Sequence, residues 1–161
     1  MSNTEIERKW LLSGFPALPP ETETAMEQAY LCFEPCTVRV RKTEAQTGVQ
    51  YMLCIKGRGT LTRTEVETPL SQEQYQALLA LAPLPPVKKL HRTYRLPGGE
   101  VAECNLVDEG HPQSFYYAEV EFENLQQAAA FLPPAFFGRE VTEEPGWTMA
   151  AYCRRRAAAI E

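Results

Sequence analysis

The chain has 161 residues, 44% of them hydrophobic, and a formal net charge of −5. This length fits a single domain over residues 1–161, and the apolar content excludes disorder as a description of the whole chain. The acidic balance with no basic tail does not favour a nucleic-acid partner, and the lack of an apolar run of about 18 residues argues against a membrane span. The five cysteines include no Cys-x-x-Cys pair and the N-terminus is charged, which indicates reduced thiols, no signal peptide and a cytoplasmic protein.

Eight segments have the alternating, β-branched pattern of strands, bounded by Gly, Pro or polar turn residues. In chain order they cover residues 5–10, 26–33, 37–42, 50–56, 61–70, 87–96, 101–107 and 115–122. The connection at residues 13–23 contains Pro16, Pro19 and Pro20 and is predicted to be a loop or an irregular lid.

Three helices are predicted, each with a recognisable N-terminal signal. They cover residues 72–81, 125–131 and 149–159. Ser71 and Gln74 form a capping box at the start of the first, and Pro83 follows its end. Asn124 and Thr148 are the expected N-caps of the other two.

The stretch Glu5-Ile6-Glu7-Arg8-Lys9-Trp10 has the most informative pattern of charge. In a strand, Glu5, Glu7 and Lys9 share one face. Two carboxylates beside an ammonium suit a divalent metal bound to a polyphosphate, although a charged edge strand open to solvent has the same pattern. The metal and phosphate interpretation is favoured because the same kind of face recurs on later strands.

Short connections predict that successive strands pair antiparallel, and eight such strands with few free edges predict a closed barrel. The face opposite the charges is apolar on strand after strand. Its members are Ile6, Trp10, Val38, Val40, Leu53, Ile55, Val66, Val120 and Phe122. Because these residues need cover from outside, the sequence predicts an α+β fold. In it a closed eight-stranded antiparallel β-barrel, or tunnel, has a charged lumen and helices packed outside.

The predicted lumen contains both signs of charge. The acids are Glu5, Glu7, Glu65, Glu67, Glu103, Glu119 and Glu121, and the bases are Lys9, Arg39, Arg41, Lys56 and Arg63. Confining so many charges is costly unless they are paired or bind ions, and mutual salt bridges account for part of the set. Arg and Lys bind phosphates, and carboxylates on neighbouring strands suit Mg²⁺ or Mn²⁺. The pattern therefore favours a phosphate ligand bound together with a divalent metal.

Several motifs, in order along the chain, resemble those of one family. Glu5 to Lys9 resembles the ExExK signature of the CYTH, or triphosphate tunnel metalloenzyme, family. The later matches are Arg39-Val40-Arg41 (RxR), Cys54-Ile55-Lys56-Gly57 (IKG), Arg63-Thr64-Glu65-Val66-Glu67 (RxExE), Ala118-Glu119-Val120-Glu121-Phe122 (AExE) and Gly138-Arg139-Glu140-Val141-Thr142 (GxEVT). Together they span nearly the whole chain, so the resemblance is much more specific than the first motif alone.

The resemblance implies an eight-stranded tunnel that binds a triphosphate with a divalent metal. It implies metal ligation by Glu5, Glu7, Glu119 and Glu121, with Glu65, Glu67 and Glu103 as further metal ligands or as partners of the bases. It implies contacts to phosphate oxygens from Lys9, Arg39, Arg41, Lys56 and Arg63, and it places Arg139 near the tunnel mouth.

One departure from the family's pattern lies on the sixth predicted strand. The family often has KxRY there, whereas this chain has His91-Arg92-Thr93-Tyr94, so the inward pair becomes His91 and Thr93. Lys89 and Arg95 have the same parity as His91. We therefore expect the cationic role on this strand to fall to Lys89, His91 or Arg95.

A second departure lies on the seventh predicted strand. The family tends to have Glu-x-Asp there, whereas Glu103-Cys104-Asn105 has an amide at the second acidic position. An amide carbonyl can ligate a metal but brings no charge, so the expectation of a second metal is weaker.

The expected reaction is metal-assisted hydrolysis of a triphosphate, first of all inorganic tripolyphosphate to pyrophosphate and phosphate. The expected catalytic residues are Glu5, Glu7, Lys9, Arg39, Arg41 and Lys56, and the further substrate-binding residues are Arg63, Lys89, His91, Arg95 and Arg139. The cations align and neutralise the triphosphate while an activated water attacks the terminal phosphorus. Two alternatives stay open: a class IV-type adenylate cyclase, and a non-catalytic protein that binds polyphosphate or a nucleotide. The sequence predicts no oligomeric state.

Overall fold

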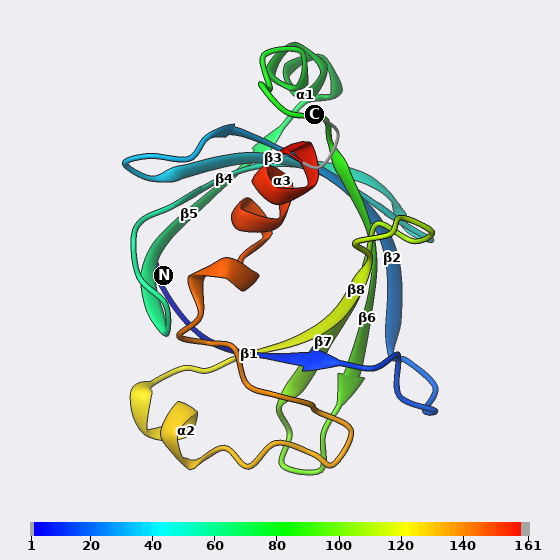
Figure 1. The fold of residues 1–161 in the computed structure, drawn as a ribbon, viewed down its shortest axis with the longest axis vertical. Helices are drawn as coiled ribbons and strands as arrows, with labels where there is room; N and C mark the ends of the chain where they lie inside the picture. The colour runs from blue at the N-terminus through cyan, green and yellow to red at the C-terminus, as the bar shows by residue number, and fades with distance from the viewer. Residues whose placement is uncertain (1, 159–161) are drawn as a thin grey trace.

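The computed structural model describes residues 2–158, and within them eight strands close into one antiparallel barrel (Figure 1). The strands are β1 (Thr4–Leu12), β2 (Thr22–Cys32), β3 (Thr37–Ala45), β4 (Gly48–Lys56), β5 (Thr62–Leu70), β6 (Val87–Arg95), β7 (Val101–Val107) and β8 (Phe115–Glu121). The prediction of a closed eight-stranded barrel is therefore confirmed.

The largest difference from the predicted strand boundaries is in β2, which begins at Thr22 instead of residue 26. These first residues are polar and prolines precede them, so the local pattern predicts a loop. In the barrel, Thr22 pairs with Thr93 and Glu23 pairs with Arg92 of β6. The partner strand, rather than local preference, makes this segment extended.

Strands joined by short turns pair with each other, as predicted, whereas two longer connections separate their strands. The order around the barrel is β1-β5-β4-β3-β2-β6-β7-β8. Residues 13–21 lead from β1 to β2, and residues 71–86 lead from β5 to β6. As a result β1 closes the barrel between β5 and β8, with Glu5 opposite Arg63 and Lys9 opposite Glu119. This closure brings the N-terminal motif beside two later charged strands.

The helices are α1 (Gln72–Leu79), α2 (Leu125–Ala130) and α3 (Met149–Ala158), with a short 3₁₀ helix η1 (Pro145–Trp147) before α3. Ser71 and Gln74 form the predicted capping box, and the side chains of Asn124 and Thr148 accept hydrogen bonds from the first turns of α2 and α3. The predicted last residue of α3, Ala159, lies outside the described residues. Within residues 2–158, the helices are too short or too polar to cross a membrane.

Helix α1 covers one part of the outward apolar face of the barrel. Its Tyr75 packs on Ala29 of β2 and Val40 of β3. This cover does not extend to Ile55 and Val66, which are opposite each other on β4 and β5 and are 39% and 42% exposed. The expectation that helices cover the whole apolar face is therefore wrong at this pair, because α1 is only two turns long.

The segment after α2 covers the outside of β1. The Trp10 ring centroid lies 5.5 Å from that of Phe131 and 4.8 Å from that of Phe137. Arg8, on the same outward face, donates from Nη1 to the Phe131 carbonyl oxygen at 3.1 Å and forms an ion pair with Glu140 at 2.7 Å. These contacts hold residues 131–140 along the barrel wall.

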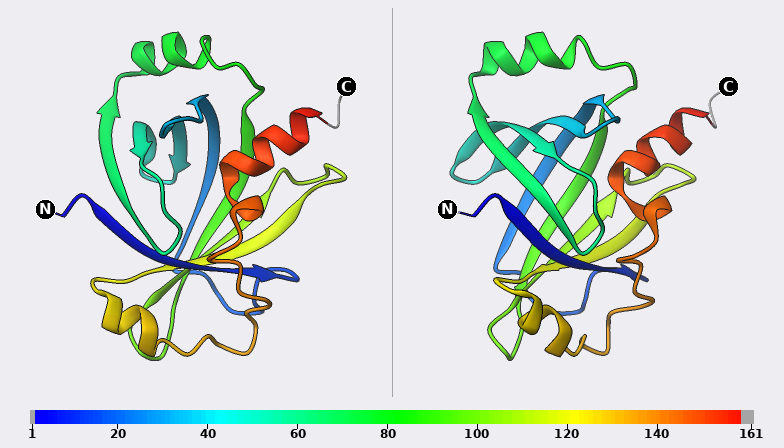
Figure 2. Two further views of the ribbon diagram at one scale, coloured as in Figure 1. Left: turned by 60° about the vertical axis from the view of Figure 1, so that its left-hand side comes forward. Right: turned by 90° about the vertical axis from the view of Figure 1, so that its left-hand side faces the viewer.

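Helix α3 lies across one opening of the barrel instead of along its wall (Figures 1 and 2). Its Met149 and Tyr152 belong to a buried cluster with Tyr30 and Tyr117, which face the lumen from β2 and β8. The Tyr152 hydroxyl donates to Asp108 Oδ2 at 2.8 Å, which fixes the helix to the turn after β7. The lumen is therefore charged along most of its length but apolar and aromatic at the end that α3 covers.

Candidate active site

Inward side chains of all eight strands surround a cavity of about 670 Å³. Strand alternation brings most of the predicted site residues to this one space. Those that line it are Glu5, Glu7, Lys9, Arg39, Arg41, Lys56, Arg63, Glu65, Glu67, Lys89, His91, Glu103, Glu119 and Glu121. The acids and bases singled out from the sequence are thus neighbours in space.

Arg95 and Arg139 do not line the cavity. The Arg95 side chain is 56% exposed, and it donates to Glu21 at 3.3 Å and to the Gly99 carbonyl oxygen at 3.1 Å. Its parity is that of Lys89 and His91, but it is the last residue of β6, where the lumen has ended. Arg139 forms an ion pair with Glu144, which is part of the cavity lining at the mouth. Arg95 therefore lies outside the cavity, whereas Arg139 lies near the cavity mouth, where the resemblance places it.

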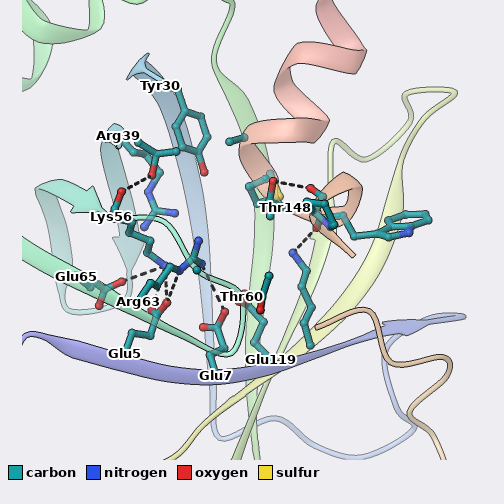
Figure 3. Close-up of a pocket in the computed structure, with 18 of the residues that line it drawn as sticks. Glu5, Glu7, Tyr30, Arg39, Lys56, Thr60, Arg63, Glu65, Glu119 and Thr148 are labelled. Carbon is teal, nitrogen blue, oxygen red and sulfur yellow. Dashed lines mark hydrogen bonds and ion pairs between the residues drawn. The ribbon is translucent and has the colours of Figure 1, made fainter. Parts of the chain in front are cut away.

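One wall of the lumen, formed by β1, β4 and β5, has a network of ion pairs (Figure 3). Lys56 Nζ lies 3.0 Å from Glu5 Oε2 and 3.0 Å from Glu65 Oε2. Arg63 Nε lies 3.0 Å from Glu5 Oε1, and its Nη2 lies 3.9 Å from Glu7 Oε1. Two of the predicted phosphate-binding cations are therefore already paired with acids.

Carboxylates crowd together where β1 meets β8. Glu5, Glu7 and Glu121 offer oxygens that all lie within 4.8 Å of one another. Burial and the Glu119 carboxylate raise the pKa of Glu7 well above its usual value, and burial with Glu5 and Glu119 raises the pKa of Glu121 to about 7. Such a group can hold a cation, which would relieve the repulsion. A second group with similar spacing consists of Cys54, Glu65 and Glu67, but there Glu65 already forms an ion pair with Lys56.

The opposite wall, formed by β2, β3 and β6, has cations with few acidic partners. Arg39 is buried and forms no ion pair within 4.0 Å among the described residues, and the nearest pairing of Arg41 is with Glu67 at 3.9 Å. Lys89 Nζ donates to the Tyr117 hydroxyl at 3.0 Å. Burial and the nearby arginines lower the pKa of Lys89 to about 7. An incoming anion would meet these cations without first displacing a strong ion pair.

The two departures from the family pattern, His91 and Asn105, contact each other. They are opposite in the β6–β7 ladder, and His91 Nδ1 lies 2.8 Å from Asn105 Oδ1. Asn105 is buried and is not part of the cavity lining, so its amide holds the imidazole instead of facing a metal. Burial and Lys89 lower the pKa of His91, which favours the neutral ring.

The mouth of the cavity includes residues that strand alternation did not single out, although Val141 and Thr142 belong to the GxEVT motif. Residues 141–150 cross it, and Lys9 Nζ donates to the Trp147 carbonyl oxygen at 2.6 Å. Thr60 donates to Glu143 at 2.5 Å from the β4–β5 turn. Gly138, just before this segment, packs closely on β1: its backbone N–H donates to the Leu11 carbonyl oxygen at 2.8 Å, and a Cβ there would lie 2.6 Å from that oxygen. These positions have no strand alternation, so no periodic signal marks them, whereas Tyr30 and Tyr117 could be found from their parity.

Glu103 provides a test of the electrostatics of the lumen. Burial and the carboxylates of Glu119 and Glu121 raise its pKa from 4.5 to about 8. At pH values between these two pKa values the folded protein binds more protons than the unfolded chain. The contribution of Glu103 to the free energy of unfolding therefore falls as pH rises. We expect Glu103→Gln, which cannot titrate, to flatten the decline in Tm between pH 5 and 8 in chelator. The matched control is exposed Glu109→Gln, and an unchanged slope in Glu103→Gln would contradict the assignment.

Comparisons with known proteins relate this chain to inorganic triphosphatases. No protein-family model matches the chain. The sequence is 34% identical, over 146 residues, to the inorganic triphosphatase of Nitrosomonas europaea, covering 88% of this chain and 91% of that protein. The solved inorganic triphosphatase NE1496 has a TM-score of 0.65 and 29% identity over 92% of this chain and 93% of its own. A putative adenylyl cyclase from Hippeastrum with a dominant triphosphatase activity shares the fold, with a TM-score of 0.58 at 16% identity over 78% of this chain and 82% of its own.

Proposed function

The chain belongs to the CYTH, or triphosphate tunnel metalloenzyme, family, and from this premise we propose that its tunnel hydrolyses inorganic tripolyphosphate to pyrophosphate and phosphate. It is a triphosphatase with an inorganic triphosphatase as a sequence relative. One observation carries the proposal: a cluster of carboxylates on one wall of the lumen faces Arg and Lys side chains on the opposite wall. A triphosphate with a divalent cation needs both surfaces at once.

The donor set at β1 and β8 fits a hard divalent cation. Glu5, Glu7 and Glu121 offer only oxygens, which are the ligands that Mg²⁺ and Mn²⁺ prefer. Burial and the carboxylates of Glu119 and Glu5 raise the pKa of Glu7, so we expect cation binding to release a proton. When bound there, the cation would supply Lewis-acid chemistry, polarising phosphate oxygens and lowering the pKa of water.

The protein's own side chains then bind and align the substrate. Arg39, Arg41 and Lys89 are available to phosphate oxygens, whereas Lys56 and Arg63 hold Glu5 in place at the cation site. Water adds to the terminal phosphorus, the bridging P–O bond breaks, and pyrophosphate leaves with the electron pair. Lumen carboxylates that the cation leaves free can accept a hydrogen bond from the attacking water. Fixed cations stabilise the charge on the transferring phosphoryl group.

Turnover of tripolyphosphate with Mg²⁺ or Mn²⁺ tests the proposed activity. We expect release of orthophosphate and pyrophosphate in equal amounts, and none in chelator. Cyclic AMP formation from ATP, with little tripolyphosphate hydrolysis, would favour the cyclase. Tight binding of tripolyphosphate with no product under either metal would overturn the hydrolase and favour a binding protein.

Binding of the linked triphosphate should stabilise the fold more than binding of single phosphates. A ligand that binds only the folded state stabilises it by roughly 2.7 kcal/mol at a hundredfold excess over its Kd. Tripolyphosphate can contact Arg39, Arg41 and Lys89 from two strands at once, so we expect a clear rise in Tm. The measurement is thermal unfolding with Ca²⁺ or no metal, to prevent turnover. Equal shifts with orthophosphate at matched ionic strength would mean generic anion binding.

A further inference from the structure

Gln28 of β2 is a buried amide in the wall of the lumen. Its neighbours of the same parity, Met26 and Tyr30, line the cavity, whereas Gln28 itself is 0% exposed. Within residues 2–158, neither its Oε1 nor its Nε2 has a hydrogen-bond partner. Buried polar groups are nearly always paired, so this side chain requires an explanation.

The unpaired amide is costly and could easily be avoided by an apolar residue. Each unsatisfied buried polar group destabilises a fold by about 1–3 kcal/mol, and Met has nearly the same length as Gln. A structural water is one way to satisfy such a group. By contrast, the buried amide of Asn105 is paired, because His91 lies 2.8 Å away.

The residue opposite Gln28 in the β2–β3 ladder is Arg41. Arg41 Nε is also buried without a partner among the described residues, so an unpaired acceptor and an unpaired donor face the lumen from opposed positions. Side chains opposite each other have Cβ atoms about 4.5–5.5 Å apart, which is within reach of both. On the other side of Gln28 is Val87, which has no polar side-chain atom.

The guanidinium of Arg41 is only loosely held among the described residues. Its Nη2 is directed toward Glu67 Oε1 at 3.9 Å, an ion pair too long for a hydrogen bond. A guanidinium binds phosphate best through two parallel N–H groups in one plane, and that plane must be held. A third contact at Nε would hold it.

We propose that Gln28 is a positioning residue for the phosphate-binding arginine Arg41, with its Oε1 accepting from Arg41 Nε when triphosphate occupies the tunnel. Both terminal nitrogens of Arg41 are then left for phosphate oxygens. Gln28 can at the same time donate from Nε2 to a water molecule or a phosphate oxygen. This inference rests on the proposed triphosphatase function and adds a residue that the motifs do not include.

The test is a double-mutant cycle of Gln28→Met and Arg41→Lys, assayed with tripolyphosphate and Mg²⁺. We expect Gln28→Met to lower kcat/KM roughly tenfold or more in the wild-type background, the size expected for a hydrogen bond to a charged group. It should have less than about a twofold effect with Lys at position 41, which has no guanidinium plane to hold. Without ligand, Gln28→Met should keep or raise Tm, while the Tm rise caused by tripolyphosphate becomes smaller.

The matched control is Thr24→Val, which removes from β2 a hydroxyl that also has no hydrogen-bond partner within residues 2–158 and that lies opposite His91 instead of Arg41. It should leave the kinetics unchanged. Unchanged kinetics in Gln28→Met, or the same loss in both backgrounds, would overturn the proposal, and Gln28→Leu serves equally if the Met variant does not fold. Absence of hydrolysis by the wild-type protein would instead overturn the proposed function itself.

Discussion

Glu7→Gln should lower the turnover of tripolyphosphate at least about a hundredfold, because loss of a residue that merely supports a metal ligand already costs 10–100-fold. Glu7 lies among the acids of the proposed cation site, and an amide there keeps the shape but removes the charge. The fold should survive, since the substitution removes a carboxylate whose pKa is raised by burial and by the neighbouring Glu119 and Glu5. Phosphate release across a Mg²⁺ titration, with Tm measured in parallel, gives both results.

The matched control for Glu7→Gln is Glu44→Gln. Glu44 is exposed on β3, forms an ion pair with Lys42 at 2.6 Å and lies outside the lumen lining. Its substitution should leave activity unchanged. Full activity of Glu7→Gln at saturating Mg²⁺ would remove Glu7 from the cation site.

Arg41→Ala should lower kcat/KM for tripolyphosphate roughly a hundredfold, the usual cost of removing one preorganised group that stabilises the transferring charge. Arg41 faces the lumen from β3, and within residues 2–158 it has only the long pairing with Glu67, so its charge is available to the substrate. Both KM and kcat should change, because the guanidinium contacts the phosphates in the ground state and in the transition state. Steady-state kinetics with Mg²⁺ measure the two separately.

Arg95→Ala is the matched control for Arg41→Ala. Parity on the strand makes both arginines candidates, but Arg95 pairs with Glu21 outside the cavity, and its loss should leave kcat/KM unchanged. Arg41→Lys should give an intermediate loss, since it keeps the charge without bidentate geometry. Unchanged efficiency in Arg41→Ala, or a large loss in Arg95→Ala, would contradict the assignment of the lumen.

Sequence patterns predicted the eight strands, apart from the first residues of β2, and most of their inward side chains. The alternation Glu5, Glu7, Lys9 on β1 and Arg63, Glu65 on β5 directly predicted side chains that line the cavity. Alternation succeeds because direction in a strand depends only on local backbone geometry. It fails at the end of a strand, as at Arg95, because parity carries no information on where a lumen stops.

The positions of the irregular segments could not be predicted from the sequence pattern. Residues 141–150 line the mouth, yet they contain no periodic pattern and their position depends on contacts with Lys9 and Thr60. The same holds for α3, because nothing in its sequence distinguishes packing on an outer wall from packing across an opening. The structure shows that it closes one end of the barrel through Tyr30 and Tyr117.

The sequence by itself determined that this protein is a closed barrel with a charged lumen and that it resembles the triphosphate tunnel family, because both follow from local alternation and ordered motifs. Only the tertiary structure decided which charged side chains pair with each other and which stay available to a substrate. Glu5 holds Lys56 and Arg63, whereas Arg41 is left for a substrate, with Gln28 opposite it. Pairing depends on distances between strands that are far apart in the chain. Those distances are set when β1 closes the barrel between β5 and β8, a contact that no local pattern encodes.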